Sequence, residues 1–203
     1  MLLDAIVLAG GRSSRLSGTP KAALLYRGET LLARTVAAAA NAQRVVVVAD
    51  VAALGLTDDL PDHVLVTREQ PPFAGPAAAI GAGMAMLEES DFVLVLACDM
   101  PEVGGAVRRL LAALRPEIDG VVAIDERQHP QPLVAVYRTG LLRAELTKRS
   151  GALPGLSVRA LTSGVRLEPV IVPSGSTDDV DTWTDAARYG ITHPPATVSK
   201  GTA

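Results

Sequence analysis

Cysteine and aromatic residues are scarce in this chain of 203 residues. One cysteine, Cys98, excludes an internal disulfide framework and a cysteine-rich metal site. Aromatic side chains make up 3% of the residues, which leaves no aromatic platform for stacking the bases of a single nucleic-acid strand. The formal net charge is −3 and no basic stripe occurs, so we expect no nucleic-acid partner.

Long apolar runs and histidines are also few. The sequence has no run of 18 apolar residues and no leader-like apolar segment at its start, so we expect no membrane partner and a cytoplasmic location. The three histidines are His63 before a predicted strand, His129 in a predicted turn and His193 in the predicted tail, and none of them pairs visibly with a nucleophile in the sequence. Ser-His or Cys-His catalysis is therefore not expected.

The most informative stretch begins with a short apolar run, residues 5–8, which predicts a buried parallel strand. The run stops at Gly10 and Gly11, and a turn without side chains lets backbone N–H groups approach a bulky anion. Arg15 and Lys21 follow and would neutralise phosphate charge. The stretch predicts a polyphosphate-binding loop; the alternative is a surface turn with incidental basic residues.

Two better-known phosphate loops do not fit this stretch. A Walker A loop places Ser or Thr after its lysine, whereas Lys21 follows Pro20 and precedes Ala22. A dinucleotide fingerprint needs three glycines at G-x-G-x-x-G spacing, which residues 10–15 do not have.

Apolar runs alternate with helical patterns along most of the chain. Strands are predicted at residues 5–8, 22–26, 45–49, 64–66, 91–97, 120–124, 133–137 and 167–172, and helices at 30–42, 75–87, 102–114, 140–149, 157–162 and 182–189. This alternation predicts an α/β fold, a three-layer α/β/α sandwich around a mostly parallel sheet. We expect one domain over residues 1–192 and a disordered tail over 193–203.

Ligands of such sheets bind beyond the carboxyl ends of the strands. Asp50 follows the predicted strand at residues 45–49, and Glu69 follows the one at residues 64–66. Both are candidates for contact with a base or ribose. Gly75 and Pro76 begin a predicted helix whose free N–H groups could face the same site, although a plain helix start is an equal alternative.

Asp99 is the most informative carboxylate. It follows the apolar run 92–97, so it lies at the rim of a buried strand, where a carboxylate is costly unless paired or bound to a cation. Mg²⁺ is typically held by one or two carboxylates together with substrate phosphates. Asp99 is therefore predicted to be a metal ligand; the alternative is that it caps the helix near Val103.

Asp181 is the candidate second metal ligand. It precedes the last predicted helix, which it or Thr182 could simply cap, with Asp185 in capping-box position. Asp179, two residues earlier, is the alternative second metal ligand if Asp181 caps the helix instead.

Nucleotidyl transfer suits this set of residues because it needs no histidine. A phosphate monoester has a second pKa of about 6, so such an acceptor is already an anion near neutrality. Arg15, Lys21 and Asp99 would then act by positioning and electrostatics alone.

Five segments together resemble the bacterial molybdenum cofactor guanylyltransferases. They are Leu8-Ala9-Gly10-Gly11 with Arg15 and Lys21, Arg68-Glu69 with Gly75–Ala78, Ala97–Pro101, His129-Pro130 with Leu133 and Val136-Tyr137, and Asp179–Thr182. The first resembles the signature loop of nucleotidyltransferases with a Rossmann-like, glycosyltransferase-A-like fold. The resemblance spans residues 8–182.

The resemblance implies a reaction. In that family the Leu-Ala-Gly-Gly loop and the lysine hold GTP, and the aspartate of the Asp-x-Pro motif holds Mg²⁺; these roles map onto residues 8–11, Lys21 and Asp99. The implied reaction is GTP plus molybdenum-molybdopterin giving the guanine dinucleotide cofactor and pyrophosphate. Transient contact with molybdoenzymes or their chaperones is also implied.

Two departures from the family pattern keep alternatives open. The segment from Arg15 to Lys21 is one residue longer than usual and ends in Pro-Lys, and Asp179 and Asp181 stand where asparagines are common. A cytidylyltransferase for the same cofactor, or a nucleotidyltransferase for another phosphate acceptor, fits the same residues. A non-catalytic protein that binds a nucleotide or cofactor is the alternative from another class.

Overall fold

The structure is a computed structural model that describes residues 1–11, 13–50, 61 and 63–193. The tail predicted over residues 193–203 lies outside the described residues apart from His193, so its predicted disorder stays a prediction.

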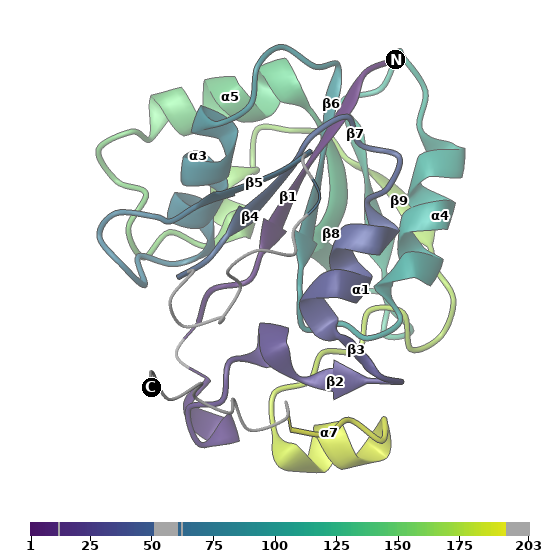
Figure 1. Cartoon of the computed structure of the whole chain (residues 1–203). Coiled ribbons are helices and arrows are strands. Elements are labelled where there is room, and N and C mark those ends of the chain that lie inside the picture. Colours follow the sequence, from purple (N-terminus) through teal and green to yellow (C-terminus); the bar gives the residue numbers. More distant parts are fainter. Residues whose placement is uncertain (12, 51–60, 62, 194–203) are drawn as a thin grey trace.

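Seven strands form the central sheet in the order β5-β4-β1-β6-β8-β7-β9 (Figure 1). Their bounds are β1 Leu3–Leu8, β4 Val45–Val48, β5 Val64–Thr67, β6 Phe92–Ala97, β7 Gly120–Ile124, β8 Pro130–Arg138 and β9 Glu168–Ile171. Neighbouring strands run parallel except at β8, which is antiparallel to both β6 and β7. The mostly parallel sheet expected from the sequence is confirmed.

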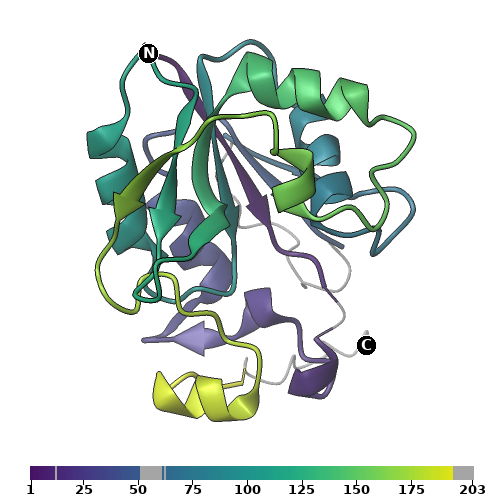
Figure 2. The same cartoon turned by 180° about the vertical axis from the view of Figure 1, so that it is seen from behind.

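Helices cover both faces of this sheet, which confirms the three-layer sandwich. The helices α1 (Leu31–Ala38) and α4 (Val103–Ala113) pack on one face, and α3 (Pro76–Ala85), α5 (Thr139–Lys148) and α6 (Val158–Leu161) lie on the other (Figures 1 and 2). None of the helices in the described part of the chain has the length and apolarity needed to cross a membrane.

The apolar runs form strands because both of their faces are buried. In β1, Ala5 and Val7 belong to the core beneath α1 and α4, whereas Ile6 and Leu8 belong to the core beneath α3 and α5. The small residues of α3 allow a close approach: a Cβ placed on Gly83 would lie 2.8 Å from a methyl carbon of Ile6. Burial of this kind supplies most of the favourable free energy of folding.

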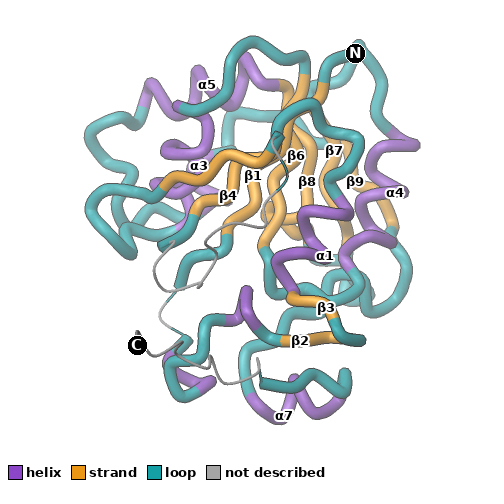
Figure 3. Tube along the Cα trace, viewed as in Figure 1, coloured by secondary structure: helices purple, strands orange, loops and turns teal. Residues whose placement is uncertain are grey.

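A separate group of short elements lies beyond the carboxyl ends of β1 and β6 (Figure 3). It comprises the 3₁₀ turns Ser14–Leu16 and Lys21–Ala23, the two-stranded hairpin β2 (Leu25–Tyr26) and β3 (Glu29–Thr30), and helix α7 (Trp183–Arg188). Residues 13–30 and 178–192 are called the cap from here on. Its apolar centre includes Leu16, Leu24 and Val180, each fully buried.

Two elements differ from the sequence-based expectation. The expected extended piece at residues 22–26 is a 3₁₀ turn followed by the short strand β2, because Pro20 leads directly into the turn. The first helix begins as predicted, with the Thr30 hydroxyl accepting from the N–H of Ala33, but it ends at Ala38 instead of residue 42. Backbone turns at Ala39 and Ala42 then lead the chain into β4.

Candidate active site

A cleft of about 870 Å³ lies between the carboxyl ends of the strands and the cap. All of the site residues predicted from the sequence line this cleft: Leu8, Ala9, Gly10, Gly11, Arg15, Lys21, Asp50, Glu69, Gly75, Asp99 and Asp181. Residues up to 173 positions apart in the chain (Leu8 to Asp181) thus meet in one site.

The loop after β1 carries the chain away from the sheet and into the cleft. The N–H of Ala9 still bonds to the Val48 carbonyl at 3.0 Å, and Gly10 and Gly11, which follow, are exposed. Gly11 has φ +145°, a conformation that side chains rarely adopt. The loop then turns at Ser13, whose carbonyl accepts from Leu16 at 2.9 Å.

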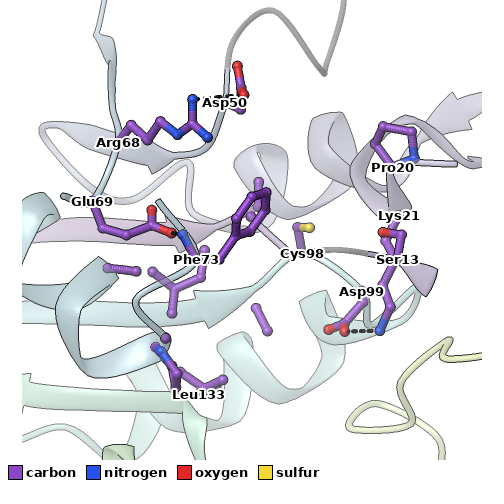
Figure 4. Close-up of a pocket in the computed structure, with 18 of the residues that line it drawn as sticks. Ser13, Pro20, Lys21, Asp50, Arg68, Glu69, Phe73, Cys98, Asp99 and Leu133 are labelled. Atoms are coloured by element: carbon purple, nitrogen blue, oxygen red, sulfur yellow. Dashed lines mark hydrogen bonds and ion pairs between the residues drawn. The ribbon is translucent and has the colours of Figure 1, made fainter. Parts of the chain in front are cut away.

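Lys21, a residue of the cap, forms ion pairs with one carboxylate at the end of a sheet strand and with another in the cap. Its ammonium lies 2.8 Å from Asp99 Oδ2 and also contacts Asp181 Oδ1 (Figure 4 shows the Asp99 contact). Burial lowers the pKa of Lys21, but Asp99 and Asp181 raise it further, so that the net pKa is above its ordinary value. The lysine is therefore a fixed positive charge at neutral pH.

Asp99 follows β6, and one of its two carboxylate oxygens is buried. Its Oδ1 is buried and has no hydrogen-bond partner among the described residues, whereas Oδ2 accepts from Lys21. Helix α4 begins after Glu102, so Asp99 does not serve as its N-cap. An unsatisfied buried carboxylate oxygen is costly. A hard cation would satisfy it.

Asp181 is free of the helix-capping role that was its alternative. Thr182 is the N-cap of α7 and forms a capping box with Asp185. The carboxylate of Asp181 instead contacts Lys21 and lies 3.5 Å from an Arg15 guanidinium nitrogen.

A third carboxylate, that of Asp179, completes a cluster of oxygen donors. One oxygen each from Asp99, Asp179 and Asp181 lie within 4.8 Å of one another. Burial, and then the charges of Asp181 and Asp99, raise the pKa of Asp179. Carboxylate oxygens are the donors that Mg²⁺ prefers, so this set fits a divalent cation, and either Asp179 or Asp181 can be the second ligand.

The opposite end of the cleft combines an ion pair with an aromatic ring. Arg68 pairs with Asp50 at 2.8 Å, and its guanidinium carbon lies 5.8 Å from the centre of the Phe73 ring. The buried carboxylate of Glu69 accepts a hydrogen bond from the Phe73 N–H at 3.0 Å (Figure 4). Glu69 thus has a structural bond beside its predicted contact with a base or ribose.

Two further features of the cleft concern Gly75 and Cys98. Gly75 has φ +96° and precedes Pro76, the first residue of α3, so the helix N-terminus lies at the cleft wall. Cys98 lines the cleft but is buried, and this burial raises the pKa of its thiol, which keeps it protonated.

Sequence reasoning missed Arg68 and Phe73 as functional candidates. Arg68 was part of the family resemblance but carried no role. Phe73 is one of two phenylalanines in the chain. Its position between two prolines and Gly75, in a loop after a strand, is the signal that could have identified it.

The amino-acid sequence is similar to those of known nucleotidyltransferases. A probable molybdenum cofactor guanylyltransferase from Deinococcus radiodurans is 34% identical over 143 residues, which cover 69% of each chain.

Two solved structures have the same fold. Molybdopterin-guanine dinucleotide biosynthesis protein A from Archaeoglobus fulgidus has a TM-score of 0.69 at 19% identity, covering 92% of this chain and 96% of its own. A 4-diphosphocytidyl-2C-methyl-D-erythritol synthase from Anaerococcus prevotii has a TM-score of 0.70 at 13% identity, covering 93% and 94%. At these identities the likeness concerns the fold alone.

The family model described as MobA-like NTP transferase domain matches residues 5–162, which is most of the chain and includes the end of β1, the glycine loop, Lys21 and Asp99. Asp179 and Asp181 follow the matched region. The protein is a nucleotidyltransferase that belongs to the MobA-like NTP transferase family.

Proposed function

We propose that the protein is a Mg²⁺-dependent nucleotidyltransferase that transfers GMP from GTP to molybdenum-molybdopterin and releases pyrophosphate. The name of the Deinococcus radiodurans relative supports the choice of nucleotide and acceptor. The observation that carries the transfer chemistry is the contact of Lys21 with both Asp99 and Asp181 at the end of β6.

Lys21 and the glycine loop are assigned to the triphosphate. The exposed backbone at Gly10 and Gly11 offers N–H groups, and the ammonium of Lys21 offers a fixed positive charge. Arg15, with a largely exposed side chain, can reach the same phosphates when its long contact with Asp181 opens. Such groups stabilise the charge that develops on departing pyrophosphate.

Asp99 and Asp181, with Asp179 beside them, are assigned to Mg²⁺. The buried Oδ1 of Asp99 supports this assignment, because it has no other partner among the described residues. A bound Mg²⁺ supplies neutralisation of phosphate charge and alignment of the α-phosphate. The carboxylates themselves would only bind and orient the metal ion.

No general base is required from this chain. The acceptor is a phosphate monoester, which is an anion near neutrality. Accordingly, the buried, protonated Cys98 thiol has no catalytic role. The work of the protein is to hold two phosphate groups in line and to exclude water.

The test is pyrophosphate release from Mg-GTP with molybdenum-molybdopterin, repeated with CTP, ATP and UTP. We expect Asp99→Asn and Lys21→Ala to lower kcat by roughly 100- to 1,000-fold, as the loss of one transition-state-stabilising group does elsewhere. Glu88→Gln is the matched control, because this exposed carboxylate pairs with Arg44 ahead of β4, at the opposite end of the strands.

Each other outcome selects an alternative. A preference for CTP keeps the mechanism and changes the product to a cytosine dinucleotide cofactor. Turnover only with another phosphate monoester reassigns the acceptor. Calorimetric binding of Mg-GTP without pyrophosphate release would make the protein a non-catalytic nucleotide-binding module. Co-purification with a molybdoenzyme or its chaperone would support the transient contact that the family resemblance implies.

A further inference from the structure

Phe73 is an aromatic residue whose side chain lies exposed at a position where exposure is energetically unfavourable. Its side chain is 50% exposed and lines the cleft, whereas the other phenylalanine, Phe92, is 1% exposed in the core. Exposing a large apolar ring to water forfeits the free energy that burial would supply. A ring left at the wall of a ligand cleft is a natural contact for a flat ligand.

The backbone of Phe73 is also unusual. Its φ is +59°, in the left-handed region that bulky residues rarely adopt. The buried carboxylate of Glu69 holds the Phe73 N–H at 3.0 Å, which fixes the loop in this conformation. Backbone conformations of this kind persist where the surroundings over-determine them, and they concentrate at ligand sites.

The guanidinium of Arg68 also lies over a face of the ring. The guanidinium of Arg68 lies 5.8 Å from the ring centre, within the range of a cation–π contact. Arg68 is in turn held by Asp50 at 2.8 Å. Backbone, arginine and carboxylate thus pre-organise the position of one exposed ring, which lowers the entropic cost of binding against it.

We propose that the Phe73 ring stacks on the nucleobase of the bound nucleoside triphosphate and favours a purine over a pyrimidine. The inference rests on the proposed function. Phe73 follows β5, which is separated by β4 and β1 from β6, the strand that carries Asp99. The charged end of the cleft, at Asp99, and the aromatic end, at Phe73, therefore lie on opposite sides of the glycine loop. A nucleotide likewise has its phosphates at one end and its base at the other.

Stacking accounts for a purine preference by contact area. Every base has a π-face, and the larger purine ring covers more of an aromatic partner than a pyrimidine does. The pterin of the acceptor is also a flat heterocycle, so the test must measure the nucleotide in the absence of acceptor.

The experiment compares the wild-type protein with Phe73→Ala, Phe73→Leu and Phe73→Trp by calorimetry with Mg-GTP, Mg-CTP and inorganic tripolyphosphate. Tripolyphosphate is the base-free probe of the charged end. Phe73→Ala should weaken GTP binding roughly tenfold and CTP binding less, consistent with stacking measured elsewhere, and leave tripolyphosphate affinity unchanged. Phe73→Trp should preserve GTP affinity. The GTP affinity of Phe73→Leu should lie between those of the wild type and Phe73→Ala.

Four results overturn the inference. Wild-type GTP affinity in Phe73→Ala would show that the ring does not touch the base. An equal loss for tripolyphosphate would show that the substitution disturbs the phosphate end instead. Unchanged GTP affinity with a raised KM for the acceptor would assign the ring to the pterin. A wild-type protein that binds no nucleoside triphosphate at all would sink the proposed function first, and the inference with it.

Discussion

The sheet and the cap contribute to one cleft but are held together by different forces. The strands β1 and β6 are buried along their whole length by helices on both faces. The cap consists of 3₁₀ turns, a hairpin of two-residue strands and a six-residue helix around a small apolar centre, and polar contacts add to this packing. Asp99 is thus positioned by a strand buried on both faces, whereas Lys21 and Asp181 are positioned by the smaller core of the cap together with hydrogen bonds and charge.

This difference indicates where the site is vulnerable. Packed cores resist local opening, and segments with few buried contacts open at much lower free energy. Two of the three charged groups that meet at Lys21, namely Lys21 itself and Asp181, come from the less packed region. We therefore expect changes in the sheet to affect global stability and changes in the cap to affect activity.

The largest expected effect is in the sheet. Leu94 of β6 is fully buried, so Leu94→Ala should lower the free energy of unfolding by about 2–5 kcal/mol. Chemical denaturation followed by circular dichroism measures this loss. The exposed Met86 offers a control, because Met86→Ala should change stability by less than about 0.5 kcal/mol. A small effect at Leu94 would mean that the packing argument is wrong.

A smaller effect, expressed in activity, is expected in the cap. The hydroxyl of Tyr189 donates to Asp178 at 2.9 Å, next to the segment that carries Asp179 and Asp181. Tyr189→Phe removes a bond worth about 0.5–1.5 kcal/mol. We expect kcat/KM to fall by about 2- to 10-fold and amide exchange to accelerate over residues 178–192, with β6 unaffected.

Tyr137→Phe is the matched variant in the sheet. Its hydroxyl donates to the Pro132 carbonyl at 2.7 Å, and the residue is fully buried. Removal of this hydroxyl from the sheet should lower the global free energy of unfolding and leave kcat/KM nearly unchanged. Equal kinetic losses in the two variants would erase the distinction between sheet and cap.

The smallest effect is expected from an ion pair outside both regions. Lys148 and then Arg149, by their hydrogen bonds, lower the pKa of Glu145 on α5. The stabilisation is present above the ordinary glutamate pKa of about 4.3 and is lost as the pH falls through the lower folded-state pKa. Glu145→Gln should melt slightly below the wild type at pH 7, and the gap should close in acid. A gap that is independent of pH would exclude this ion pair as its cause.

The sheet was largely predictable from the sequence because its strands are continuous apolar runs. Residues 45–49 and 91–97 leave little choice but a doubly buried strand. The direction of β8 was not predictable, since residues 133–137 have the same composition whether they run parallel or antiparallel. The early end of α1 was also not predictable, because alanines at 39, 40 and 42 favour continuation.

The candidate site was predictable at the charged end and poorly so at the aromatic end. Glycine, lysine and aspartate at strand ends have few structural reasons to occur together, so Gly10, Lys21 and Asp99 were identifiable. Whether Asp181 capped α7 could not be settled without knowing that Thr182 takes that position. Arg68 and Phe73 were missed because their importance depends on contact across the loop, which no local pattern encodes.

One contact between the sheet and the cap has a consequence for the order in which the chain is made. The N–H of Val180 bonds to the Asp99 carbonyl at 2.9 Å, and Thr192 pairs with Leu25 through two backbone bonds. The segment that completes the site is therefore translated about 80 residues after Asp99 and 160 after Lys21. A nascent chain can therefore build most of its sheet on the ribosome before the residues that complete the cleft, Asp181 among them, have been made. We expect activity to begin only once this last segment has emerged.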